Sequence, residues 1–126
     1  MAITTFEDLD VWKRSCQLAV DVCVATHESK NFGLKDQLQR SAISVPSNIA
    51  EGSERDSDGD FIRFLRISKG SCAELRTQLY ISERVQKTLA LPVMEKSRPM
   101  IQETREIAAM LQGLIRSIES RRPKKP

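Results

Sequence analysis

The sequence has 126 residues, of which 40% are hydrophobic and 29% charged, with 20 Lys and Arg side chains against 17 Asp and Glu side chains. This composition predicts one globular domain and excludes both a disordered chain and a membrane-spanning segment. The net charge of +3 is unevenly placed, because residues 116–126 hold five basic side chains and one acidic one. We therefore predict a near-neutral domain over residues 1–120 and a basic, mobile tail over residues 121–126.

Four stretches follow the periodicity of helices, and no stretch alternates convincingly like a strand. Residues that break helices stand between them, and the predicted helices cover residues 6–28, 34–54, 59–88 and 92–120. Thr4 and Ser57, each followed three positions later by an acid, mark the starts of the first and third helices. Pro46 should bend the second helix, and Pro99 either kinks the fourth or marks its first turn. Four helices with short connections predict an all-α, antiparallel up-down four-helix bundle.

Apolar residues spaced by three and four positions predict one inward stripe on each helix. On the first helix this stripe is Leu9, Trp12, Cys16, Ala19 and Cys23. The stripes on the other three helices are Leu34, Leu38, Ala42, Val45 and Ile49; Phe61, Leu65, Ser68, Cys72, Leu75 and Leu79; and Ile101, Ala108, Leu111, Ile115 and Ile118. Together they predict one contiguous core.

The first helix carries a second apolar stripe on its opposite side, formed by Val11, Leu18, Val22 and Ala25. One bundle cannot bury both stripes, which favours a second copy of the chain against this helix. We therefore predict a homo-oligomer, with Val11, Leu18 and Val22 as the candidate interface. The alternative is that the second stripe is tolerated surface apolarity.

The rare residues argue against an enzyme or a metal centre. There is one histidine, His27, which we interpret as structural, and the three cysteines, Cys16, Cys23 and Cys72, lack the CxxC spacing of zinc and redox sites. We interpret the cysteines as buried, reduced thiols of a cytoplasmic protein, and the N-terminus does not resemble a secretory signal. No cofactor is predicted.

Two clusters that could suggest chemistry have simpler explanations. The acidic turn at residues 56–60 lacks the glycine and glutamate positions of an EF-hand, so we interpret it as a turn with a helix cap. Asn48 and Glu51 lie within one turn of each other, but no nucleophile or phosphate cradle accompanies them. We predict a protein without enzymatic activity, and a small hydrolase using this pair is the weakest alternative.

One flank of the third helix is basic, and so is the C-terminal tail. The flank places positive charge along about six turns, with Tyr80 available for stacking on a base, and its candidate nucleic-acid contacts are Arg66, Lys69, Arg76, Arg84 and Lys87. The tail adds the candidates Arg121, Arg122, Lys124 and Lys125. The alternatives are a solvated helix flank and a solubilising tail, which leave a protein-interaction scaffold without a nucleic-acid role.

The residues from Phe32 to Gly52, with an internal proline followed by Asn48-Ile-Ala-Glu-Gly52, resemble the signature of the large-subunit (23S) ribosomal RNA intervening-sequence protein family. The opening Phe6-Glu-Asp-Leu9-Asp-Val-Trp12 and the later segments beginning at Asp60 and Gly70 are similar to that family in order and spacing. The resemblance spans nearly the whole chain.

This resemblance implies a bacterial, cytosolic four-helix bundle that assembles as a ring-like homo-oligomer, a pentamer. It further implies a relation to the accessory variability determinant of diversity-generating retroelements, which works with a reverse transcriptase and nucleic acid. The expected partners are thus other copies of the chain, RNA or another nucleic acid, and a protein partner, with no role for a membrane.

Overall fold

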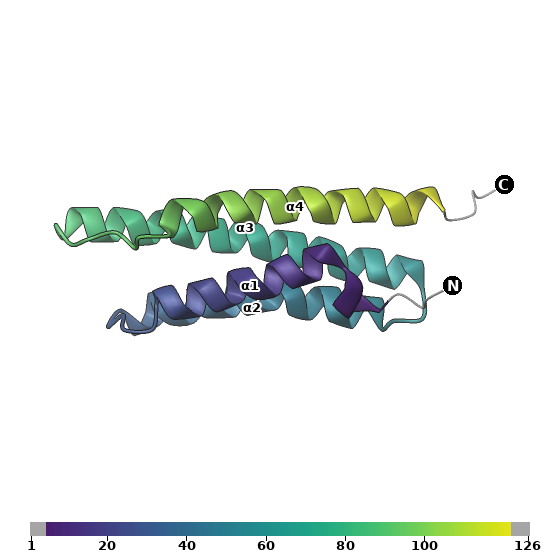
Figure 1. Cartoon of the computed structure of the whole chain (residues 1–126), viewed down its shortest axis with the longest axis horizontal. Coiled ribbons are helices and arrows are strands. Elements are labelled where there is room, and N and C mark those ends of the chain that lie inside the picture. The colour runs from purple at the N-terminus through teal and green to yellow at the C-terminus, as the bar shows by residue number, and fades with distance from the viewer. Residues whose placement is uncertain (1–4, 122–126) are drawn as a thin grey trace.

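The computed structural model describes residues 5–121 as a short 3-10 helix followed by four α-helices (Figure 1). The 3-10 helix, η1, covers Phe6–Asp8, and the α-helices are α1 (Asp10–Ala25), α2 (Phe32–Ser53), α3 (Asp58–Thr88) and α4 (Ser97–Ser120). This architecture confirms the predicted all-α class with four helices. Within the described residues, no helix is both long and apolar enough to span a membrane.

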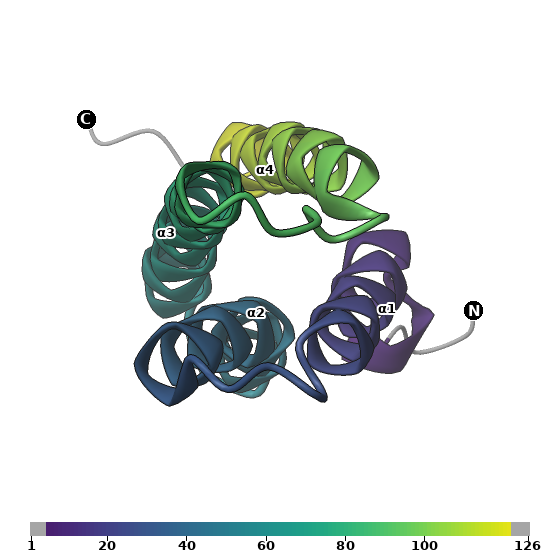
Figure 2. The ribbon, with the colours of Figure 1, turned by 90° about the vertical axis from the view of Figure 1, so that its left-hand side faces the viewer.

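The four helices are arranged as a square in chain order, each beside the two helices that precede and follow it around the bundle (Figure 2). Side chains from all four meet along the axis, where Val22, Leu38, Leu75 and Ile107 are 0–2% exposed. The predicted stripes of α2, α3 and α4 lie in or against this core. Burial of these apolar side chains is the main force that holds the helices together.

On α1 the second predicted stripe supplies more of the core than the first, of which Ala19 is buried and Leu9 and Trp12 pack against the core. Val11, Leu18 and Val22, expected at an oligomer interface, are at most 5% exposed and belong to the core of the same chain. Cys16 and Cys23, expected in the core, are only half-buried. The interface prediction is therefore wrong for these three residues, because their own bundle already covers them.

The helix ends follow from local hydrogen bonding. Ser57 begins α3 as predicted, since its hydroxyl accepts from the Asp60 amide at 3.1 Å. Helix α4 begins at Ser97, five residues later than predicted, so Pro99 lies in its first turn, where a missing amide hydrogen costs little. At the end of α3, Ala90 has a positive φ of 56°, and the Leu91 amide donates to the Gln86 carbonyl at 2.8 Å. This is the geometry of a Schellman cap.

An ion cluster links α1 to α4, the pair of neighbouring helices with the least extensive contact. The Arg14 guanidinium donates to the carboxylates of Glu103 and Glu106, the latter at 3.0 Å. The hydrogen bond from Arg14 holds the pKa of the Glu106 carboxyl below its ordinary value, and the hydrogen bonds that Arg14 donates to both carboxylates raise the pKa of Arg14. The cluster fixes which side of α1 faces α4.

Candidate nucleic-acid interface

The basic flank predicted on α3 lies along α4, where the two antiparallel helices form a polar seam. Arg66 pairs with Glu119 at 3.4 Å, Lys69 donates to Gln112 Oε1 at 2.8 Å, and Arg76 Nε donates to Thr104 Oγ1 at 2.9 Å. These contacts place the three cations on the α4 side of α3. Residues 66–87 extend over about 32 Å of helix, a length that can follow several phosphates of a nucleic acid.

Three further arginines extend this seam from the α4 side, and the sequence analysis missed them. Arg98 and Arg105 reach residues of α3, and Arg116 is exposed one turn after Gln112, the partner of Lys69. A signal was present, because Arg98 and Arg105 stand seven residues apart and so share one helical face. We call the following set the basic seam: Arg66, Lys69, Arg76, Arg84, Lys87, Arg98, Arg105 and Arg116.

Two carboxylates lie along the same seam, and one of them is removed from solvent. Glu83 is 4% exposed, with one oxygen 3.0 Å from Arg98 Nε and the other without a hydrogen-bond partner among the described residues. Glu119 is exposed and pairs with Arg66. Eight cations against these two acids leave the seam strongly positive, so it would attract a polyanion.

Tyr80 does not have the role predicted for it. Its hydroxyl accepts from Arg105 at 2.7 Å, and the Arg98 guanidinium lies 5.5 Å from the centre of its ring. The ring is therefore engaged in a cation–π contact rather than open for a stacked base. Tyr80 instead holds two arginines at the surface of the seam.

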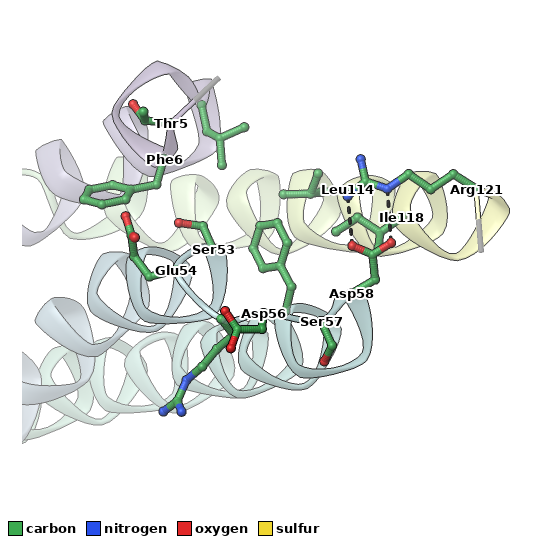
Figure 3. A pocket seen from close by; sticks show the side chains of 13 residues that line it. Thr5, Phe6, Ser53, Glu54, Asp56, Ser57, Asp58, Leu114, Ile118 and Arg121 are labelled. Carbon is green, nitrogen blue, oxygen red and sulfur yellow. Dashed lines mark hydrogen bonds and ion pairs between the residues drawn. The ribbon is translucent and has the colours of Figure 1, made fainter. Parts of the chain in front are cut away.

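The start of the predicted basic tail is fixed at one end of the bundle. Arg121 pairs with Asp58 through two hydrogen bonds of 3.2 and 3.4 Å, beside a cavity of about 460 Å³ between η1, the α2–α3 connection and the end of α4 (Figure 3). Glu54 and Asp56 also line this cavity. The other predicted tail contacts, Arg122, Lys124 and Lys125, lie outside the described residues.

The remaining candidate residues have structural roles. Asn48 donates to the Ser44 carbonyl at 2.8 Å, and Glu51 pairs with Arg55 at 2.9 Å, so both are used by their own helix. His27, which the sequence analysis interprets as structural, is exposed and follows the end of α1.

The three cysteines are free, as predicted, but they are not equally buried. Cys72 lies in the core, and burial raises the pKa of its thiol to about 11, while Cys16 and Cys23 are only half-buried. Burial also raises the pKa of the Cys16 thiol. Neither shift favours the thiolate that a nucleophilic cysteine would need.

Charge is also divided between the two halves of the bundle. Residues 5–54, which form η1, α1 and α2, carry five basic and eight acidic side chains, a net charge of −3. Residues 55–121, which include α3 and α4, carry twelve basic and nine acidic side chains, a net charge of +3. The near-neutral body predicted from composition is therefore a bundle with an acidic half and a basic half.

The fold and the seam together define a class of protein, a small four-helix bundle with one basic side. The family model described as 23S rRNA-intervening sequence protein matches residues 7–113, and the chain belongs to that family. The predicted resemblance is thereby confirmed at the level of the family.

A solved structure is similar to this fold along almost its whole length. It is a protein of unknown function from the S23 ribosomal protein family of Bacteroides thetaiotaomicron, with a TM-score of 0.71 and 26% sequence identity. The similarity covers 83% of the present chain and 97% of that chain. None of the curated proteins matches this chain. Neither the family's description nor the neighbour's names an enzymatic activity.

Proposed function

We propose that this protein is a non-enzymatic, self-assembling bundle of the bacterial cytoplasm that binds RNA along the basic seam. The observation that carries the proposal is the eight cations that α3 and α4 bring to one surface, with one of the two nearby acids buried. Phosphate contacts of this kind bind nucleic acid without reading its sequence. The family's name connects its members with 23S rRNA, which makes RNA the first nucleic acid to test.

Self-assembly, as a ring of five copies, and a relation to the retroelement accessory determinant are part of this proposal. Large apolar side chains exposed on α1, α2 and α3 support assembly, and the free cysteines support a reducing compartment. A ring would repeat the basic seam and tail once per copy, so its affinity for RNA could exceed that of one chain.

Removing charge from the basic seam should weaken RNA binding and its dependence on salt. In the variant Lys69→Gln/Lys87→Gln/Arg116→Gln, three exposed cations are lost without removing an ion pair described in the structure. Loss of three phosphate contacts should lower the slope of log affinity against log salt by about 2 to 3. Fluorescence anisotropy of a labelled hairpin RNA over a salt series measures this slope.

The matched control removes the same charge from the other half of the bundle, as Lys13→Gln/Lys30→Gln/Arg40→Gln. We expect its slope to stay within about one unit of the wild-type slope. Equal losses in both variants would show attraction by net charge alone and contradict a defined site. Absence of RNA binding by the wild-type protein would favour the protein-interaction scaffold.

A further inference from the structure

Several of the apolar side chains that stay exposed on the described bundle form two surfaces. The first is a ridge on the acidic half: Val20 and Val24 of α1 are 53% and 70% exposed, and Ile43 of α2 is 49% exposed. Val20 and Val24 are one turn apart on one face of α1. Ile43 lies one turn after Gln39, which donates to Thr26 at 3.0 Å, so it belongs to the α1 side of α2. We call these three residues the apolar ridge.

The second surface is a shallow groove along the outer side of α3, on the basic half. Two adjoining hollows, of about 380 and 440 Å³, share Ile81 and extend from Ala73 to Leu89. Ile81 is 47% and Leu89 61% exposed. Arg84 lines the second hollow, and Gln78 lines the first. We call this surface the α3 groove.

A polar atom at the α3 groove is unsatisfied within the monomer. Gln78 Oε1 is buried and has no hydrogen-bond partner among the described residues. A buried acceptor without a donor costs free energy, and the Gln78 side chain would recover this cost by turning its oxygen outward to a donor on a docked partner. This atom therefore distinguishes the α3 groove from exposed apolar side chains that need no partner.

We propose that the apolar ridge of one copy docks in the α3 groove of the next copy. The net charges of the two halves fit this pairing, because the half that carries the ridge has a net charge of −3 and the half that carries the groove has a net charge of +3. Asp21 and Glu28 flank the ridge, and the groove itself is lined by one cation, Arg84, and one acid, Glu74. The ridge and the groove are different surfaces, so the contact is head-to-tail and can close into a ring. This inference rests on the self-assembly in the proposed function and names its two faces.

The pairing leaves the basic seam accessible except at Arg84, which also lines the α3 groove. The seam lies on the α4 side of α3, as its contacts with Glu119, Gln112 and Thr104 show. The α3 groove instead adjoins α2, because Gln37 of α2 lines it. Arg84 stands at the border of the two surfaces. RNA binding and assembly can therefore coexist on one chain.

Two single variants test the pairing, each placed at an exposed side chain so that the fold is kept. Val24→Lys introduces a cation on the ridge, and Ile81→Glu introduces an acid in the groove, so each also opposes the proposed charge pairing. Each should weaken self-association by at least about 30-fold, as loss of a central apolar contact does. Sedimentation velocity should then show the 14.3 kDa monomer where wild type is assembled. Phe32→Glu, at an apolar side chain 71% exposed outside both surfaces, is the matched control and should assemble normally.

Mixing the two variants separates head-to-tail from symmetric contacts. Val24→Lys keeps an intact groove and Ile81→Glu an intact ridge, so an equimolar mixture should form a complex of two chains. A mixture that stays monomeric, or single variants that assemble like wild type, would overturn the pairing while leaving self-assembly intact. A wild-type protein that is monomeric throughout would instead overturn the self-assembly part of the proposed function and this inference with it. Circular dichroism of each variant confirms that it is folded.

Discussion

Gly52→Ala is expected to lower the free energy of unfolding by about 3 kcal/mol, the upper end of the usual cost of overpacking. A β-carbon at Gly52 would lie 2.6 Å from Phe64 Cβ and 3.1 Å from Phe61 Cδ1. Because Phe64 Cβ is bonded directly to the backbone, it cannot move aside as a side-chain tip could. Helices α2 and α3 would have to separate, which strains the 2.8 Å bond from Ser68 Oγ to the Val45 carbonyl.

Two other glycines in helices provide the matched controls, because a β-carbon at Gly70 or Gly113 meets nothing within 4 Å. Alanine at either position should raise the free energy of unfolding by about 0.5 to 1 kcal/mol, since glycine loses more backbone freedom in a helix. Urea unfolding followed by circular dichroism measures all three variants. A Gly52→Ala protein as stable as wild type would contradict the close α2–α3 contact.

Leu18→Ala is expected to cost about 2 to 5 kcal/mol, because it opens a cavity in the core. Leu18 is 2% exposed and packs within the buried cluster of the same chain. Cys16→Ala, in the half-buried stripe of the same helix, is the control and should cost less than about 1 kcal/mol. Denaturant unfolding at several protein concentrations separates this effect from assembly. A larger loss for Cys16→Ala than for Leu18→Ala would mean that the stripe predicted from the sequence is the inner one.

The buried side of α1 could not be predicted from the sequence, whereas the buried sides of α2, α3 and α4 could. Helices α2, α3 and α4 each have one dominant apolar stripe, so periodicity alone identified most of their buried apolar residues, although it missed Ile62, Phe64, Met100 and Ile107. Helix α1 has two, and a single helix contains nothing that decides which one turns inward. Tertiary contacts determine which stripe of α1 faces the core. Among them are the hydrogen bonds from Arg14 to Glu103 and Glu106 on α4, which are 89 and 92 residues away in sequence.

The α3 part of the candidate site could be predicted from the sequence, whereas the α4 part could not, because it depends on how the helices pack. The basic flank of α3 is continuous in sequence and could be recognised from its spacing. The contribution of Arg98, Arg105 and Arg116 depends on which face of α4 lies beside α3, which packing determines. The engagement of Tyr80 by two arginines likewise follows only from the placement of α4.

The central claim is that RNA binds along the α3–α4 side of the bundle. Ultraviolet crosslinking of the wild-type protein to hairpin RNA, followed by mass spectrometric mapping of the crosslinked peptides, tests it most directly. Crosslinks are expected to concentrate in residues 58–121, which include α3 and α4, and to be lost in the Lys69→Gln/Lys87→Gln/Arg116→Gln variant. Crosslinks concentrated in α1 and α2, or a pattern unchanged in that variant, would contradict it.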